Sequence, residues 1–298
     1  MRSDLRTSAI ALYDRFTHEG MDRRALMAEL TRIAGSAAAA NALVATIAAA
    51  PAAAAVVPAD DKRIRSRTTN WRAGGRPMRG YVAEPVKPAA RLGSVLVIHE
   101  NRGLNEHIRD VARRLAVAGY RALAPDFLTP AGGTPADEDA AREAIARLDL
   151  ALSVADGVAT IGMLKSLPRS NGLAGAVGFC WGGGMVNRLA VAAGDRLQAG
   201  VAFYGPAPDP AEAPKVQAAM LLHFAGLDER VNMTGLPWAE ALRAAGKTVV
   251  SHVYPGVNHA FHNDASAERY DAAAARKAWE ATLAFLATRV RDAPGTDL

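Results

Sequence analysis

The chain has 298 residues and a formal net charge of +5, and half of its residues are hydrophobic. This is the composition of a globular protein, and the length allows one catalytic domain of ordinary size plus an extension. Its single cysteine, Cys180, excludes an intrachain disulfide. The excess positive charge lies mainly between Lys62 and Arg79. Because aromatic residues are sparse there and no nucleic-acid motif is present, we favour a solvated arginine-rich segment and expect no nucleic-acid partner.

Residues 1–60 differ in composition from the rest and are expected to form a helical extension. Helical patterns run from Asp4 to His18 and from Arg23 to Ala49, with an uncharged alanine-rich run at the end. The pair Arg23-Arg24, followed by a weakly apolar run and small residues, resembles a twin-arginine export signal, which would imply a periplasmic protein. The alternative is a helical arm that packs on the body or on a second subunit, which leaves a cytoplasmic location open. The run is too weakly hydrophobic for a stable membrane span.

Residues 61–298 have the pattern of one α/β domain. Short apolar runs alternate with helical patterns, which indicates a central, mostly parallel sheet with helices on both faces. The expected strands are an edge strand at Arg79–Ala83, then Ser94–His99, Arg121–Ala124, Gly175–Phe179, Ala199–Phe203, Ala219–Phe224 and Val249–Tyr254. The expected helices are Ile108–Ala118, a broken stretch at Ala136–Ser166, Gly183–Ala193, Pro237–Ala245 and Ala267–Thr288. Gly119 and Gly246 follow two of these helices, where a left-handed cap residue is expected. Ligands of such a sheet bind at the carboxyl ends of its strands.

The segment Gly178-Phe179-Cys180-Trp181-Gly182 joins one of these strands to a helix. It has the pattern of a nucleophile elbow, G-x-C-x-G, in which the glycines permit a sharp strand-to-helix turn. The following helix N-terminus favours a negative charge on sulfur. We therefore expect Cys180 to be a nucleophile rather than a small buried apolar residue.

A thiolate nucleophile needs a base, and the base needs an orienting carboxylate. In α/β-hydrolases the chain order is nucleophile, acid, histidine. Asp228 ends an apolar strand at a Gly-Leu-Asp turn, 48 residues after the cysteine, and His259 follows a Pro-Gly turn 31 residues later. The neighbouring His252 lies within a strand. A zinc site at His259 and His262 would lack a third ligand, so we expect no metal.

These motifs resemble those of the dienelactone hydrolase (carboxymethylenebutenolidase) family over residues 78–290. The cysteine elbow and the upstream pair His99-Glu100 carry the resemblance most specifically, and further matches lie at 119–126, 203–205, 226–228 and 255–261. The resemblance implies an α/β-hydrolase fold and cofactor-free hydrolysis of a carboxylic ester or lactone. It implies a Cys180-His259-Asp228 triad that forms a thioester. It also implies that Glu100 contacts the resting cysteine and controls its ionisation, whereas His99 packs against Glu100 or orients it.

The oxyanion hole is expected to use the backbone N–H of Trp181 and, by resemblance, that of Asn101. Asn263 stands where family members that bind anionic lactones have an arginine, so the sequence does not single out dienelactone as the substrate. The side chains expected to contact a small ester or lactone are Arg102, Tyr204, Phe261 and His262. The protein is expected to be a monomer or homodimer. The alternative function is a catalytically silent α/β-hydrolase-like protein that binds a small ligand.

Overall fold

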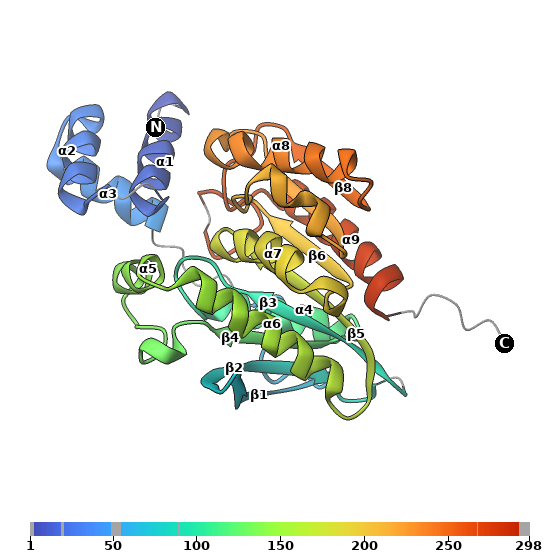
Figure 1. The fold of residues 1–298 in the computed structure, drawn as a ribbon. Helices are drawn as coiled ribbons and strands as arrows, with labels where there is room; N and C mark the ends of the chain where they lie inside the picture. Colours follow the sequence, from blue (N-terminus) through green and yellow to red (C-terminus); the bar gives the residue numbers. More distant parts are fainter. Residues whose placement is uncertain (1–2, 19–20, 49–54, 89, 267, 292–298) are drawn as a thin grey trace.

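The computed structural model describes residues 3–18, 21–48, 55–88, 90–266 and 268–291. Its centre is an eight-stranded sheet with the order β1-β2-β4-β3-β5-β6-β7-β8 (Figure 1). The pairs β1–β2 and β2–β4 are antiparallel, and all other neighbours are parallel. This is the α/β-hydrolase arrangement that the sequence predicted. The strands are β1 Ile64–Ala73, β2 Arg76–Pro85, β3 Leu92–Ile98, β4 Arg121–Asp126, β5 Ser170–Phe179, β6 Ala199–Phe203, β7 Ala219–Ala225 and β8 Val249–Tyr254.

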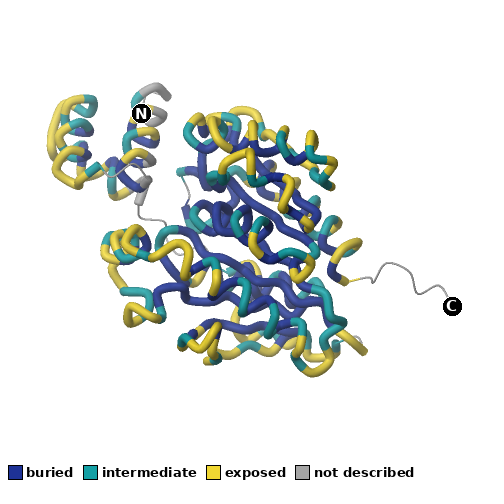
Figure 2. The backbone as a smooth tube through the Cα atoms, viewed as in Figure 1, coloured by how far each residue is buried: buried dark blue, intermediate teal, exposed yellow. Residues whose placement is uncertain are grey.

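Helices cover both faces of the sheet, as expected. One apolar core joins α4 (Glu106–Val117) and α9 (Ala272–Leu286) to the sheet. A second core on the other face joins α6 (Leu150–Ser166), α7 (Trp181–Ala192) and α8 (Glu229–Ala244) to it. Figure 2 shows the central strands buried between these layers, whereas the outer faces of the helices are exposed.

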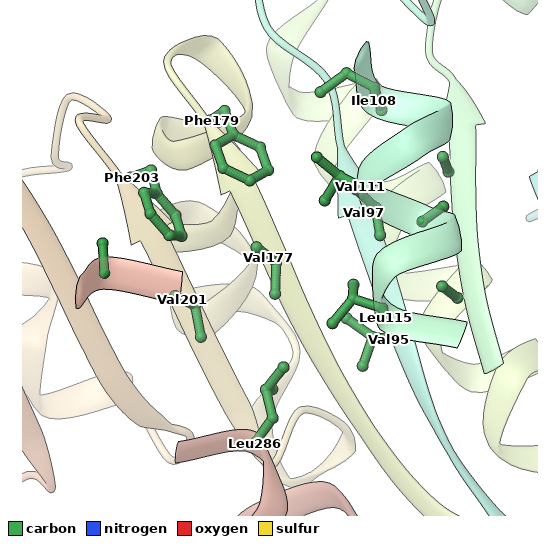
Figure 3. Packing of buried hydrophobic residues seen from close by; sticks show 14 of the residues in the cluster. Val95, Val97, Ile108, Val111, Leu115, Val177, Phe179, Val201, Phe203 and Leu286 are labelled. Carbon is green, nitrogen blue, oxygen red and sulfur yellow. The ribbon is translucent and has the colours of Figure 1, made fainter. Parts of the chain in front are cut away.

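The first core explains why the sheet is rigid beneath Cys180. Valines and phenylalanines at alternate positions of β3, β5 and β6 point to the same face, as the strand period of two requires. They pack against aliphatic residues of α4 and α9 (Figure 3). Phe179 and Phe203 are fully buried, and their ring centroids lie 4.7 Å apart. Because each such side chain contributes about 1.5–3 kcal/mol on burial, the strand end that carries Cys180 is firmly held.

The arginine-rich segment corrects one prediction. It contains β1, which the sequence analysis did not predict, and the expected edge strand at 79–83 lies inside the sheet as part of β2. In β1 only the terminal Ile64 and Ala73 are buried, so the strand has no apolar alternation to reveal it. Backbone pairing with β2 holds it instead, and Arg65 and Arg67 form ion pairs with Glu84.

Several helix boundaries also differ from those expected. Helix α8 begins at Glu229, and the expected start at Pro237 lies inside it. Helix α9 begins at Ala272 behind its capping residue Asp271; the expected start, Ala267, lies outside the described residues. The stretch at 136–166 is broken, as predicted, into α5 (Glu138–Ala146) and α6. Gly119 and Gly246 have φ of 96° and 70°, which confirms their predicted left-handed conformations. Short 3-10 or π turns lie at Thr129–Ala131, Gly194–Arg196, Pro210–Lys215 and Ala287–Arg291.

The N-terminal extension has three helices with a small core of their own: α1 Ser3–His18, α2 Arg23–Ala34 and α3 Ala37–Ala48. The single helix expected from Arg23 to Ala49 is wrong, because Gly35 adopts φ of 81° and ends α2. Tyr13 and Phe16 of α1 pack against Leu30 and other apolar residues of this core. Within the described part of the chain, no helix is both long and apolar enough to cross a bilayer. The small residues that would end an export signal, 49–54, lie outside the described residues.

Candidate active site

Cys180 occupies the turn between β5 and α7. Its φ of 55° and ψ of −116° are rare for a residue other than glycine, so the turn is strained. The surrounding backbone enforces it. Cys180 N–H donates to Phe203 O at 3.0 Å, and Gly184 N–H donates to Cys180 O at 3.0 Å. A Cβ on Gly178 would lie 2.1 Å from the carbonyl oxygen of Gly182, which explains the glycine requirement of the turn.

Asp228 and His259 meet at this turn. Asp228 follows β7 and caps α8, where its Oδ1 accepts from Val231 N–H at 3.2 Å. Its Oδ2 lies 2.5 Å from Nδ1 of His259. Cys180 and His259 line one small recess, and the charge of the sulfur acts on the imidazole ring. All three side chains are buried, so this chain of contacts has little competition from solvent.

The charges of the pair follow from these contacts. Burial lowers the pKa of His259, but Asp228 and Cys180 outweigh it and raise this pKa to about 10. Burial raises the pKa of Asp228, but His259 outweighs it and the pKa falls below its ordinary value. At neutral pH the carboxylate is therefore ionised and the imidazole protonated, with Nδ1–H donating to Asp228.

Glu100 follows β3 and lies beside Cys180 and His259. It is buried, and its Oε2 accepts from Nδ2 of Asn263 at 2.6 Å. Asn263, which stands where family members that bind anionic lactones have an arginine, thus holds Glu100. The carboxylate, Cys180 and His259 line one small recess together with Arg269. The structure therefore brings together all four residues that the sequence analysis proposed as catalytic.

His99 lies behind this site. Its Nε2 accepts from Phe127 N–H at 3.3 Å, so the proton is on Nδ1, which donates to Glu100 O at 2.7 Å. Burial lowers the pKa of His99, which favours the neutral ring. The ring stacks on Trp181 with centroids 5.3 Å apart. His99 therefore packs beside Glu100 and the elbow, as expected.

The two residues expected to form the oxyanion hole stand beside Cys180. Trp181 is the first residue of α7, and N–H groups in a first helical turn have no partner within the helix. Asn101 comes directly after Glu100, and its side chain donates to Thr17 O at 2.9 Å. Together with Cys180, both residues line a cavity of about 260 Å³.

Of the side chains expected to contact substrate, Arg102 lines a cavity at Cys180, whereas Tyr204 and Phe261 do not. Arg102 lines the recess, but its guanidinium donates to Glu138 at 2.6 Å and to the Tyr13 hydroxyl at 2.8 Å. Tyr204 and Phe261 are fully buried and line neither cavity at Cys180. The Tyr204 ring packs against that of His259, with centroids 4.9 Å apart, so these aromatics support the histidine from behind.

His262 does not line either cavity that contains Cys180. It stacks on Phe179, with ring centroids 5.1 Å apart, and lines a separate cavity of about 480 Å³. Burial and the nearby His107 lower its pKa well below the ordinary value, which favours a neutral ring. Among the residues that the structure describes, no group of His, Cys, Asp and Glu is arranged to hold a metal ion.

The sequence analysis missed four polar residues that line these cavities. Arg142 and Arg230 line the 260 Å³ cavity, Arg269 lines the recess, and Thr17 of the N-terminal extension lines both. The only feature of the sequence that could have pointed to any of them is that Arg230 follows Asp228 by two residues. The others come from elements that no motif connects to the elbow.

Comparisons with known proteins place the chain in a family. The model of the Dienelactone hydrolase family matches residues 78–290. A protein of Escherichia coli O157:H7 named "Putative carboxymethylenebutenolidase" is 32% identical over 253 residues, covering 79% of this chain and 92% of its own. A protein of Synechocystis with the same name is 34% identical over 235 residues, covering 71% of this chain and 92% of its own.

Solved structures show the same fold. A crystal structure titled as a "Putative Dienelactone Hydrolase" from Klebsiella pneumoniae has a TM-score of 0.68 and 29% identity, covering 75% of this chain and 98% of that one. An acylaminoacyl peptidase of Pyrococcus horikoshii is 17% identical with a TM-score of 0.59, covering 79% of this chain and 44% of that one, and shares the fold alone. The chain therefore belongs to the dienelactone hydrolase family, and it is a hydrolase that acts on carboxylic ester or lactone bonds.

Proposed function

We propose that this hydrolase uses Cys180 as its nucleophile and proceeds through a thioester on that residue. The observation that supports this most directly is that Cys180 and His259 line one recess, with Nδ1 of His259 2.5 Å from the Asp228 carboxylate. A protonated imidazole beside the sulfur stabilises the thiolate, which is the reactive form. The N-terminus of α7 adds a favourable dipole at the same position.

In the first half of the reaction the thiolate attacks the ester carbonyl. The carbon–sulfur bond forms, and the carbonyl oxygen takes up the negative charge. We assign the backbone N–H groups of Trp181 and Asn101, which line the same cavity as Cys180, as donors of hydrogen bonds to this oxyanion, and one such donor is typically worth about 3–4 kcal/mol. When the intermediate collapses, the carbon–oxygen bond breaks and His259 donates its proton to the leaving alkoxide.

In the second half a water molecule attacks the thioester carbonyl. His259, now neutral, accepts a proton from the water, and Asp228 stabilises the imidazolium that forms. Collapse of the second intermediate releases the carboxylic acid and restores the thiolate and the imidazolium. The balance is one ester and one water converted to one acid and one alcohol, with no cofactor required.

We assign Glu100 to control of the charge at Cys180. Its Oε2 is held by Asn263, and its Oε1 is buried without a hydrogen-bond partner among the described residues. A buried carboxylate next to the sulfur disfavours a second negative charge. A substrate that displaces or neutralises this carboxylate would therefore favour the thiolate.

The test is the turnover of p-nitrophenyl esters by Cys180→Ala and Cys180→Ser variants. The proposal expects no turnover above background for the alanine variant and at least a hundredfold loss for the serine variant. His259 is arranged to pair with a thiolate rather than to deprotonate a hydroxyl. Full activity of Cys180→Ala would refute the proposal. Unchanged unfolding temperatures of both variants would exclude misfolding as the cause of a loss.

A further inference from the structure

Helix α1 of the N-terminal extension lies against the candidate active site. The three N-terminal helices stand beside the hydrolase body (Figure 1). Their contacts with it are specific. Asn101 donates to Thr17 O at 2.9 Å, Arg102 donates to the Tyr13 hydroxyl at 2.8 Å, and Arg142 donates to Phe16 O at 3.3 Å.

The arginines of the body also meet the aromatic rings of α1. The Arg142 guanidinium lies 4.4 Å from the centroid of Phe16, and those of Arg102 and Arg269 lie 5.9 and 5.8 Å from the centroid of Tyr13. At these distances the ring faces attract the guanidinium charges. Because the same rings form part of the core of the extension, they join its three helices to the rim of the site.

Thr17 has the most informative position. Its side chain is buried and donates to Tyr13 O at 3.0 Å within α1. It lines the 260 Å³ cavity together with Cys180 and Trp181. It also lines the recess that contains Glu100 and His259. A wall of the substrate cavity is therefore made by a residue more than 160 positions before the nucleophile.

We propose that α1 is a lid of the active site, retained in the working enzyme, and that Thr17 is a specificity-determining residue that limits the size of the ester accepted at Cys180. The selection of ester size by Thr17 rests on the proposed cysteine hydrolase, whereas the closure of α1 over Cys180 is independent of that proposed function. The lid covers the thiol, which is only 4% exposed, and it opens to admit substrate and release product.

The first test compares Thr17→Trp with Thr31→Trp in the full-length protein. Thr31 lies in α2 and makes the same kind of hydrogen bond, to Met27 O at 2.7 Å, but it lines neither cavity. We expect Thr17→Trp to lower kcat/KM for p-nitrophenyl decanoate about tenfold or more and to change the value for the acetate less than about threefold, because a larger side chain narrows the cavity. Thr31→Trp should change neither. Equal effects of the two variants on both esters would overturn the assignment of Thr17.

The second test measures lid opening without turnover, and it therefore separates failure of the lid from failure of the proposed chemistry. Cys180 is the only thiol in the chain. The rate at which a fluorescein maleimide labels it reports access to the site. Tyr13→Phe removes only the hydroxyl bound to Arg102, and loss of a hydrogen bond to a charged group should speed labelling about tenfold. Tyr270→Phe, at the separate cavity, is the control.

Labelling of Tyr13→Phe at the wild-type rate would overturn the lid. The variant keeps the ring in the small core, so it should remain folded. The intact mass of the protein isolated from its host gives a third, independent answer. A mature chain that lacks residues 3–18 would also overturn the proposal, because no lid would then be present.

Discussion

Replacement of Asp228 by asparagine tests the electrostatics of the site in most detail. The carboxylate oxygen that lies 2.5 Å from His259 Nδ1 would become part of a neutral amide. The pKa of His259, raised to about 10 in the native site, should fall towards its ordinary value of 6.5. A tenfold change in a protonation equilibrium is about 1.4 kcal/mol. Cys180 also raises the pKa of His259 and remains in the variant, so only part of the shift should be lost. We therefore expect Asp228→Asn to lose about 2–3 kcal/mol of imidazolium stabilisation.

The sign of the pH dependence follows from the direction of the shift. A group whose pKa is raised by folding stabilises the fold fully below its ordinary pKa, and this contribution is lost as the pH rises through the folded value. The difference in free energy of unfolding between wild type and Asp228→Asn should therefore be largest near pH 6. It should decline between pH 6.5 and about 10. Urea unfolding across this range measures it.

The same variant should lower kcat/KM for p-nitrophenyl acetate by about 10³–10⁴, the size of effect known when a triad carboxylate becomes an amide. Its activity should also decline at a lower pH than that of the wild type on the alkaline side, because His259 would lose its proton earlier. The assay is a pH–rate profile from pH 5 to 10.5.

Asp271→Asn is a matched control. Asp271 caps α9 by accepting from Ala274 N–H at 2.8 Å, as Asp228 caps α8, but it lies outside the site. It should lose less than about 1 kcal/mol of stability and no activity. If Asp228→Asn kept its kcat/KM within tenfold of wild type, or if Asp271→Asn lost as much, the reasoning would be refuted.

Four further variants, one of them a control, test other parts of the account. Glu100→Gln should change kcat/KM at least about tenfold and leave the free energy of unfolding within about 1 kcal/mol, since it removes a buried charge and keeps its shape; no kinetic change would contradict the role of Glu100. Gly178→Ala should cost about 2–4 kcal/mol by thermal unfolding because of its clash with Gly182 O, whereas Gly162→Ala, with open space in α6, should stabilise by about 0.5–1 kcal/mol. Burial raises the pKa of Glu84, but Arg121 and Arg65 outweigh burial and the pKa falls below its ordinary value. Glu84→Gln should therefore lower the free energy of unfolding above about pH 4.5 and lower it progressively less as the pH falls below that value. A loss of stability that stayed the same in acid would contradict the role of these ion pairs.

The sequence predicted the fold, and it predicted which four side chains would meet at the candidate site, because both leave local patterns. The apolar run before Cys180, the glycines around it and the helix after it are all set by the demands of one turn. Asp228 and His259 were found because chain order and strand ends restrict where a partner can stand. Glu100 was found because it follows a buried strand and because the family resemblance implies a glutamate there, and the hydrogen bond from Asn263 explains how that carboxylate is held.

What the sequence did not predict depends on contacts between distant elements. Strand β1 carries charged side chains on an exposed edge, so backbone pairing rather than apolar alternation defines it. Thr17 and Arg269 reach the site from α1 and from the loop before α9, and neither has a local signature. His262 follows His259 by three residues, yet its ring stacks on Phe179 and lines the separate cavity of about 480 Å³.

Mass spectrometry of the acylated enzyme tests the central claim most directly. The protein would be mixed with a p-nitrophenyl ester of a bulky acid, quenched in acid within the first turnover and digested. The account predicts an added acyl group on the peptide that contains Cys180, lost again when the thioester is treated with neutral hydroxylamine. An acyl group found on another residue, or full turnover with the thiol blocked, would contradict it.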